Sequence, residues 1–302
     1  MSKTAIIIVT YNSAAEIGAC LDAAILTGAE IVVVDNASTD STRVETERRK
    51  VRFIANAENR GFAAAVNQGF AAVSCPYVLL LNPDAILQTG IEALEQGCEL
   101  PDSAGACGRL IDPAGRLQRG FTVRRLPTVA SLTLEVLLLT RIWPGNPVNR
   151  RYRYLDLDYG RVSAVEQPAG ALLMVRRAVW EELGGLDESF FPLWFEDVDF
   201  CRRIKDRGLN LYYMPQAVAK HTGGHSIPQL SVENRRIYWY RSLLRYTFKH
   251  FHPVQHRVVC VAVLGGAFLR GLVETAHSRS ARPIAVYGRI VKLAGRCLLF
   301  GF

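Results

Sequence analysis

The sequence lacks the usual marks of a secreted, membrane-spanning or zinc-binding protein. Its seven cysteines are scattered through 302 residues without a C-x-x-C pair, which favours a reducing compartment and argues against a zinc site. No stretch reaches the roughly 18–20 uninterrupted apolar residues of a spanning helix. An apolar strand pattern begins directly after Met1-Ser2-Lys3, so we expect no signal segment there.

Two common nucleotide-binding motifs are also missing. No G-x-G-x-x-G follows Val9 and no G-x-x-x-x-G-K-[ST] occurs, which disfavours a dinucleotide fold and a P-loop. We find neither an internal repeat nor a low-complexity linker. The composition, 49% hydrophobic and 21% charged, is that of a globular protein. A net charge of +8 suits an anionic ligand, an anionic lipid or a nucleic acid, and does not choose among them.

The first hundred residues alternate between strand and helix patterns. Bulky apolar runs bounded by polar residues predict buried strands at residues 5–9, 31–34, 51–54 and 77–81. Helices are expected from Asn12 or Ser13 onward and over residues 41–50, 63–73 and 89–99. This order predicts an α/β fold with a mostly parallel, twisted sheet flanked by helices.

The pattern changes twice further along the chain. From about residue 104 the alternation weakens, with a turn at 111–116, an apolar and mobile amphipathic segment at 128–142, and strands at 171–175 and 209–214, the last stopped by Pro215. We therefore predict one domain over residues 1–228, divided into halves 1–103 and 104–228.

A basic amphipathic helical region is expected over residues 229–302. There Arg241, Arg245 and Lys249 recur every four residues opposite an apolar stripe, which is typical of a helix lying on a membrane surface.

Acids follow several of the predicted strands. Pro83 cannot continue a central ladder, so Asp84 is expected at the carboxyl edge of the sheet, where open α/β folds bind ligands. Asp35 and Asp40 follow an earlier strand in the same way. Acids in such places are also common helix caps and turn formers, and Asp40 is open to either interpretation.

Six short motifs together resemble a known family. They are VTYN at 9–12, VDNASTD at 34–40, NRGF at 59–62, LNPD at 81–84, FEDVD at 195–199 and HTGGHS at 221–226. In this order they resemble a family 2 inverting glycosyltransferase of the GT-A fold, closest to its rhamnosyltransferase-like branch. The resemblance covers roughly residues 4–250 and implies a nucleotide-sugar donor.

The resemblance implies roles for individual residues on the donor side. The donor nucleotide would lie against Thr10, Tyr11, Asn12, Asp35, Asn36, Asn59, Arg60, Gly61 and Asn82, with Asp35 accepting a hydrogen bond from the base. Asp84 matches the last acid of the D-x-D signature, and Asn82 replaces the first. With His221 it would hold Mn²⁺ or Mg²⁺ on the donor diphosphate. The alternative for His221 is a structural histidine, and His225 is a weaker candidate.

The same resemblance places the chemistry at Glu196 and Asp197, with the second acid as general base. Inverting transfer needs a carboxylate that deprotonates the acceptor hydroxyl opposite the leaving diphosphate. Aromatic neighbours should desolvate that acid and raise its pKa; they are Phe190, Phe191, Trp194 and Phe195. Gly170 and Trp194 would lie on the acceptor side. Asp199 is expected to complement the helix dipole and pair with Arg202 and Arg203.

These observations favour an enzyme that transfers a sugar, with L-rhamnose from dTDP-rhamnose as one candidate, to a lipid-linked or polysaccharide acceptor. We expect it in the cytoplasm, peripheral on the inner face of the cell membrane, with anionic lipid as a partner. The alternatives are a nucleotidyltransferase with a related sheet and a basic nucleic-acid- or membrane-surface-binding protein. Acids at the strand ends repel phosphate without a metal, which argues against nucleic acid as a partner. The oligomeric state stays open.

Overall fold

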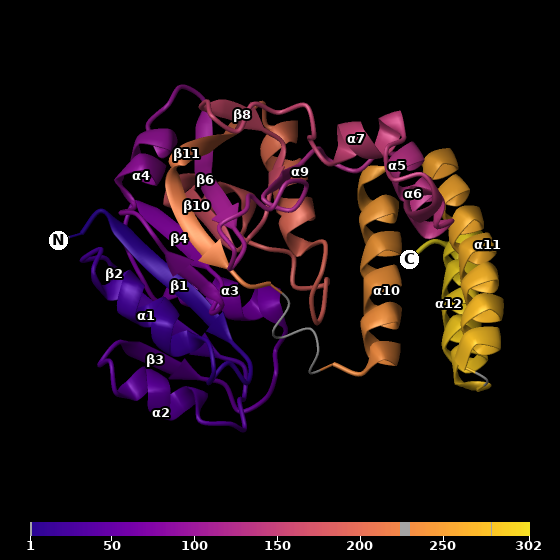
Figure 1. The fold of residues 1–302 in the computed structure, drawn as a ribbon, viewed down its shortest axis with the longest axis horizontal. Coiled ribbons are helices and arrows are strands. Elements are labelled where there is room, and N and C mark those ends of the chain that lie inside the picture. The colour runs from indigo at the N-terminus through magenta and orange to yellow at the C-terminus, as the bar shows by residue number, and fades with distance from the viewer. Residues whose placement is uncertain (1, 224–229, 279) are drawn as a thin grey trace.

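A sheet domain lies beside a group of C-terminal helices in the computed structural model, which describes residues 2–223, 230–278 and 280–302 (Figure 1). The sheet is built from the earlier part of the chain, and the C-terminal helices come from its last quarter. Two elements lie between these parts. They are the segment that holds α5, α6 and α7, and the long helix α10. The helices are α5 (Val129–Val136), α6 (Leu139–Ile142), α7 (Pro147–Tyr152) and α10 (Val232–His250).

The first half of the sheet is parallel, as predicted. Its strands lie in the order β3-β2-β1-β4 and are β1 (Thr4–Thr10), β2 (Glu30–Asp35), β3 (Arg52–Ala55) and β4 (Tyr77–Leu81). The helices between them are α1 (Ile17–Ile25), α2 (Thr42–Glu47) and α3 (Phe62–Ala71). Strands β1, β2 and β4 are buried nearly throughout because helices cover both faces, which explains their unbroken apolar runs.

One helix start was predicted wrongly. The first helix begins at Ile17, not at Asn12 or Ser13. The carbonyl of Ser13 accepts hydrogen bonds from the amides of Glu16 and Ile17, so this segment forms a turn before the helix. Asn12 is held outside the helix with φ of 48°.

The second half adds an antiparallel strand. β10 (Leu172–Arg176) lies between β4 and β6 (Ser103–Ile111) and runs antiparallel to both. β11 (Asn210–His221) pairs parallel to β6 and antiparallel to β5 (Ala85–Leu87) and β8 (Ser163–Val165). The sheet is therefore mixed, with its parallel half carrying the strand ends singled out in the sequence.

Pro215 does not end a strand. β11 continues through it to His221, and its register against β6 shifts between Met214 and Val218. An irregularity of this kind accommodates a residue that has no backbone N–H to donate. The continuation has a consequence for the site, because it brings His221 opposite Ala85, next in the chain to Asp84.

The apolar segment at 128–142 forms packed helices rather than a mobile stretch. Thr128 and Ser131 make a reciprocal capping box at the start of α5. Leu132 and Val136 are buried, and α5 packs against α11 (Pro253–Ser278). The remaining elements are α4 (Glu92–Cys98), α8 (Arg177–Leu183), α9 (Glu196–Asp206), α12 (Arg282–Phe300) and the ribbon β7 (Val123–Arg124) with β9 (Gln167–Pro168).

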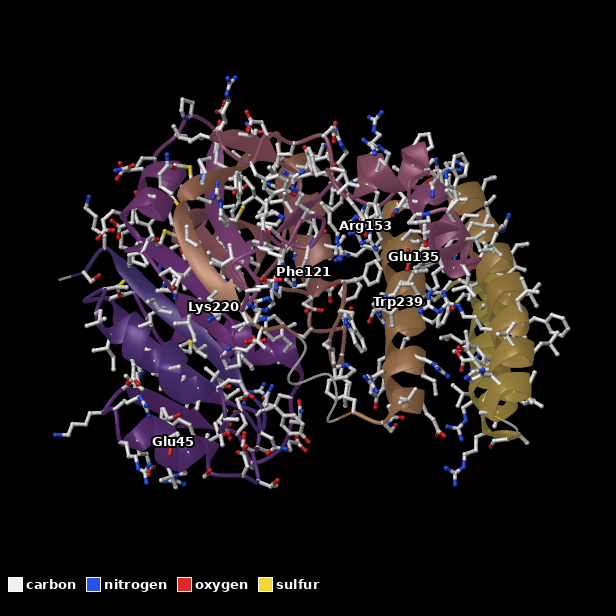
Figure 2. All side chains as sticks on the ribbon, viewed as in Figure 1. Glu45, Phe121, Glu135, Arg153, Lys220 and Trp239 are labelled. Atoms are coloured by element: carbon white, nitrogen blue, oxygen red, sulfur yellow. The ribbon has the colours of Figure 1, made fainter. Side chains whose placement is uncertain are left out.

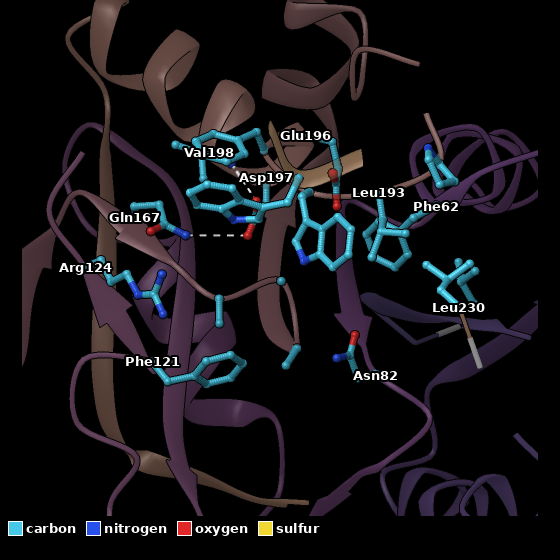
Figure 3. A pocket seen from close by; sticks show the side chains of 18 of the residues that line it. Phe62, Asn82, Phe121, Arg124, Gln167, Leu193, Glu196, Asp197, Val198 and Leu230 are labelled. Atoms are coloured by element: carbon cyan, nitrogen blue, oxygen red, sulfur yellow. Dashed lines mark hydrogen bonds between the residues drawn. The ribbon is translucent and has the colours of Figure 1, made fainter. Parts of the chain in front are cut away.

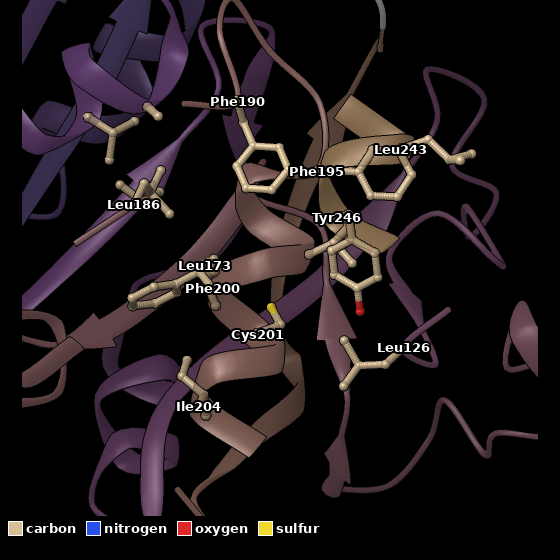
Figure 4. Packing of buried hydrophobic residues seen from close by; sticks show 14 of the residues in the cluster. Leu126, Leu173, Leu186, Phe190, Phe195, Phe200, Cys201, Ile204, Leu243 and Tyr246 are labelled. Carbon is tan, nitrogen blue, oxygen red and sulfur yellow. The ribbon is translucent and has the colours of Figure 1, made fainter. Parts of the chain in front are cut away.

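Helix α10 belongs to the hydrophobic core. Leu243 and Tyr246 of α10 are buried against Phe195, with ring centroids of Tyr246 and Phe195 5.5 Å apart (Figure 4). Two of the three cations in its predicted basic stripe make contacts within the protein. Lys249 Nζ lies 2.7 Å from carboxylate oxygens of both Asp187 and Asp199. The guanidinium of Arg245 lies 4.1 Å from the ring centroid of Phe302. Because α10 packs against neighbouring helices, Lys249 and Arg245 contribute to the fold.

Within the described ranges, one helix is long and apolar enough to cross a membrane by length and composition alone, namely α11. One of its faces packs against α5, α10 and α12.

Candidate active site

A cavity of about 530 Å³ opens where β1 and β4 end, and it extends to the start of α9 and to α5 and α10 (Figure 3). Most of the predicted site residues line it. They are Thr10, Tyr11, Asn36, Asn59, Asn82, Asp84, Gly170, Trp194, Glu196 and Asp197. Five others do not line it: Asn12, Asp35, Arg60, Gly61 and His221. The sheet topology thus brings together residues more than 180 positions apart.

Asp35 lies behind the cavity wall. Its buried carboxylate accepts hydrogen bonds from Thr10 Oγ1 at 2.7 Å and from the Ser38 amide at 2.9 Å. Asn12 Oδ1 accepts from the Thr39 amide at 2.7 Å. These bonds tie the loops after β1 and β2 together, so both residues shape the loops. The contact of Asp35 with a base stays a prediction.

Asp40 acts as a local cap. Its carboxylate accepts hydrogen bonds from the amides of Thr42 and Ala14, both at 3.0 Å. Asp40 thus connects the start of α2 to the loop after β1. Of the two interpretations that the sequence left open, this is the helix cap.

The turn before α3 needs glycine. Gly61 has φ of +85°, and a Cβ there would lie 2.8 Å from the Phe191 ring. Its amide donates to Asn59 Oδ1 at 2.9 Å, and its carbonyl accepts from Asn36 Nδ2 at 3.0 Å. Phe191 covers this glycine, is 41% exposed and does not line the cavity, so its predicted part in desolvating the base stays a prediction.

Asp84 and His221 form a buried pair at the edge of the cavity. His221 Nε2 lies 3.5 Å from Asp84 Oδ1, and Asp84 Oδ2 accepts from the Gly223 amide at 2.8 Å. His221 Nε2 is buried and has no hydrogen-bond partner among the residues described. An orphaned ring nitrogen beside a carboxylate calls for a ligand.

Gln118 shows which nitrogen of His221 is free. The amide nitrogen of Gln118 donates to the His221 carbonyl at 2.8 Å, which turns its Oε1 toward His221 Nδ1 at 3.1 Å. Nδ1 must then carry the proton, leaving a lone pair on Nε2. Burial also lowers the pKa of His221, which favours the neutral ring. A neutral imidazole oriented by an outer hydrogen bond is the usual form of a metal-ligating histidine.

Asp84 and His221 suit a divalent cation whose remaining ligands come from outside the protein. The described part of the chain holds no group of three His, Cys, Asp or Glu side chains that could bind a metal alone. One carboxylate and one imidazole leave positions for diphosphate oxygens and water, as in sites where metal and nucleotide bind together. His225 lies outside the described residues.

The start of α9 is turned into the cavity by two strained residues. Trp194 and Phe195 have φ of 76° and 70°, in the left-handed region that side chains rarely adopt. Packing holds them there, since Phe195 is buried against α10 and Ser242 Oγ donates to the Leu193 carbonyl at 3.2 Å. The turn places Glu196 and Asp197 at the helix N-terminus, facing the cavity.

Burial raises the pKa of both acids at this helix start, by different amounts. Glu196 is buried, its Oε2 has no hydrogen-bond partner in the described structure, and the charge of Asp197 adds to the effect, so its pKa lies well above the usual range. The pKa of Asp197 is raised by burial, while hydrogen bonds from the Val198 and Gly170 backbone and the charge of Arg124 oppose the rise. Glu196 therefore retains its proton more strongly, and Asp197 is the better base.

Asp199 is structural, as predicted, with one different partner. Arg203 Nε lies 2.8 Å from its carboxylate, whereas Arg202 pairs with Asp206. His250 Nε2 lies 2.6 Å from Asp199, adding a bond to α10.

Several cavity residues carry no motif and escaped the sequence analysis. Gln167 Nε2 donates to Asp197 Oδ2 at 3.5 Å, and Figure 3 shows Arg124 beside them. Arg153, Glu135 and Trp239 lie between the sheet domain and the C-terminal helices (Figure 2). They come from three elements whose meeting depends on long-range packing, so no local spacing could identify them.

Comparisons with known proteins agree with this fold. Residues 5–127 match the model of glycosyl transferase family 2. An N-acetylglucosaminyl-diphospho-decaprenol L-rhamnosyltransferase of Mycobacterium tuberculosis is 29% identical, over 72% of this chain and 79% of the relative. Rhamnosyltransferase WbbL of Escherichia coli is 24% identical, over 55% and 60%.

Among solved structures, the mannosyltransferase PcManGT of Pyrobaculum calidifontis, in complex with GDP-Man and Mn²⁺, superposes with a TM-score of 0.56. It is 17% identical and covers 99% of this chain and 87% of its own, so it supports the fold alone. The nine-stranded mixed sheet with flanking helices is that of the GT-A fold. Residues 5–127 thus match a family 2 glycosyltransferase domain, and the chain is similar to the rhamnosyltransferases.

Proposed function

We propose that this protein transfers a sugar, with inversion, from a nucleotide-diphosphate donor to an acceptor hydroxyl. One observation carries the proposal: a desolvated carboxylate, Asp197, faces the same cavity as Asp84, beside which the unpaired His221 nitrogen lies. Asp197 takes the proton of the hydroxyl as its oxygen bonds to the anomeric carbon, and the bond from that carbon to the diphosphate breaks. The general base and the metal-binding pair must occupy separate positions at one cavity.

Asp84 and His221 would hold a divalent cation, Mn²⁺ or Mg²⁺. When bound, such an ion neutralises charge on the leaving diphosphate. The residues Thr10, Tyr11, Asn36, Asn59 and Asn82 would bind the nucleotide along the neighbouring strand ends. Gly170 suits the acceptor side, because a Cβ there would meet no atom within 4 Å and would project into open space.

The relatives suggest the substrates. Their names support L-rhamnose, from dTDP-rhamnose, as the donor sugar, and a lipid-linked diphospho-sugar or a glycan as the acceptor. The expected setting is the cytoplasmic face of the membrane, where lipid-linked acceptors are exposed to soluble nucleotide sugars.

A hydrolysis screen of nucleotide sugars tests this function, since hydrolysis needs no acceptor. With Mn²⁺ present we expect slow release of the nucleoside diphosphate from dTDP-rhamnose, and none with EDTA. Release of pyrophosphate from a nucleoside triphosphate and a sugar phosphate would instead indicate a nucleotidyltransferase. Metal-independent hydrolysis would contradict the assignment of Asp84 and His221.

We also propose that α11 and α12, rather than α10, dock on anionic lipid. One face of α11 exposes an apolar stripe; it consists of Val254, Val258, Val261, Phe268, Leu269, Leu272 and Val273. The exposed side of α12 is cationic and carries Arg282, Arg289, Lys292 and Arg296. Glu274 is the sole acid from residue 253 onward, and it is paired with Arg236. Each cation near an anionic surface contributes about 1 kcal/mol.

Sedimentation with phosphatidylglycerol–phosphatidylcholine vesicles checks this docking. We expect the protein to sediment with them, to detach as salt rises, and to stay soluble when Phe268→Asp is combined with Leu272→Asp. Leu26→Asp is a control, because Leu26 caps the end of α1 and is 87% exposed. Equal binding to neutral vesicles, or an equal loss in the control, would contradict the docking. Self-association that disappears in the double variant would identify the stripe as a contact between copies.

A further inference from the structure

Part of the cavity lies between the sheet and the helices that face it (Figure 2). This part is bounded by Arg124 of β7, Arg153 after α7, and by Leu132, Glu135 and Trp239 of the helices that face the sheet. Figure 2 shows Arg153, Glu135 and Trp239 together in this part of the molecule. The same cavity therefore holds the acids Asp84 and Asp197 and two guanidinium groups.

These two arginines line the cavity without a carboxylate partner among the described residues. Arg125 pairs with Asp156 at 3.1 Å, and Arg161 pairs with Asp158 at 3.2 Å. For Arg124 and Arg153, no carboxylate of the described residues lies within ion-pair distance. Cations that line a cavity without a carboxylate partner are available to an anionic ligand.

The protein nevertheless holds both side chains in place. Arg124 Nε donates to the Gly120 carbonyl at 2.7 Å, and its guanidinium lies 5.9 Å from the Tyr152 ring centroid. Arg153 Nε donates to Asn149 Oδ1 at 3.2 Å. In each case Nε is used within the protein, and no partner within the described residues takes the terminal nitrogens. Those two nitrogens are the ones that bind a phosphate.

The other charged groups in this part of the cavity do not cancel the arginines. The Glu135 carboxylate accepts from Thr140 Oγ1 at 3.0 Å and lies beyond ion-pair distance of both guanidinium groups. Asp197 feels the charge of Arg124, which lowers its pKa, yet burial keeps that pKa raised. The walls between these groups are apolar, with Leu132 buried and Trp239 partly buried. An amphipathic ligand with an anionic group matches such a surface.

We infer that Arg124 and Arg153 bind the diphosphate of a lipid-linked acceptor, with Leu132 and Trp239 against the start of its lipid chain. This rests on the proposed function, since it takes the sugar hydroxyl to lie at Asp197. The acceptor diphosphate and the donor diphosphate then occupy opposite ends of the cavity. Arg124 and Arg153 contribute to the choice of acceptor, and the donor is bound without them.

Binding of farnesyl diphosphate, a short prenyl diphosphate, tests the inference on the full chain. The titration follows tryptophan fluorescence, because Trp194 and Trp239 line the cavity. Saturating dTDP and EDTA keep the probe from the donor end. We expect Arg124→Gln and Arg153→Gln each to weaken binding by about 10- to 100-fold, the usual cost of losing a hydrogen bond to a charged group. Farnesol should bind all variants alike, and pyrophosphate alone should bind more weakly than farnesyl diphosphate.

Arg161→Gln is the control, since it removes one exposed guanidinium outside the cavity. Equal weakening in this variant, or equal affinity of the native protein for farnesol and farnesyl diphosphate, would overturn the inference. Pyrophosphate binding as tightly as the prenyl compound would show a free-anion site rather than a lipid-diphosphate site. The hydrolysis screen decides the proposed function separately, because arginine-dependent binding without sugar transfer would leave this site standing.

Discussion

Asp197→Asn is expected to lower turnover by about 10²–10⁴-fold, the usual contribution of a positioned general base. The amide keeps the shape of the carboxylate and can still accept from the Val198 amide, which donates to Asp197 Oδ1 at 2.8 Å. It cannot take the proton of the acceptor hydroxyl. Donor affinity and its dependence on Mn²⁺ should stay near the native values, because Asp197 lies at the start of α9, whereas Asp84 follows β4.

Glu196→Gln is the matched comparison and should be mild. Burial and the charge of Asp197 raise the pKa of Glu196 well above its usual range, which favours the neutral carboxyl. A neutral amide replaces a neutral acid with little change in charge or volume. If Glu196→Gln loses turnover while Asp197→Asn keeps it, the base is Glu196. If neither variant loses turnover, the single displacement proposed here is wrong.

The pH dependence of the native enzyme should follow the same carboxyl. The pKa of Asp197 is raised, so its protonated, inactive form persists to a higher pH than for an ordinary aspartate. Turnover should therefore fall as the pH drops through the raised pKa of Asp197. At higher pH the rate should reach its maximum. In Asp197→Asn this acidic limb should disappear, and moderately alkaline pH should not restore turnover because the acceptor alcohol stays protonated. An unchanged acidic limb in the variant would assign it to another group.

The parallel half of the fold was predictable because β1, β2 and β4 are buried on both faces, which gives unbroken apolar runs. The antiparallel direction of β10 was not, since its apolar run is the same whichever way the strand is paired. The prediction that the strand ends at Pro215 was wrong, because the register shift that accommodates this proline depends on the partner strand β6.

The site shows the same division. Asp84 and Asp197 could be singled out from local sequence motifs, because one follows the end of a strand and the other lies at the start of a helix. The role of α10 does not, because a basic amphipathic pattern cannot show that Lys249 will meet Asp187 and Asp199 from other segments. Gln118 and Arg153 lie in segments without a motif, and only the packed chain brings them to His221 and to the cavity.

The second large effect is expected for Asp84→Asn, which should abolish divalent-dependent binding of the nucleoside diphosphate. Asn can still accept from the Gly223 amide, as Asp84 does at 2.8 Å, so the loop should keep its place. What is lost is the one carboxylate of the predicted metal site, since Asn82 stands where the signature has its first acid. Lewis-acid neutralisation is worth several kcal/mol, so we expect affinity to fall by about 100-fold or more.

Calorimetry with dTDP, with and without Mn²⁺, measures this effect directly. The native protein should bind more tightly with the ion, whereas Asp84→Asn should bind equally in both conditions. Asp102→Asn is a suitable control, because Asp102 is exposed and its φ of 53° suits asparagine. His221→Gln adds an independent check, since an oxygen or amide in place of the bare Nε2 should weaken Mn²⁺ more than Mg²⁺. Unchanged Mn²⁺-dependent affinity in Asp84→Asn would place the metal elsewhere and leave the pairing of Asp84 with His221 a structural contact.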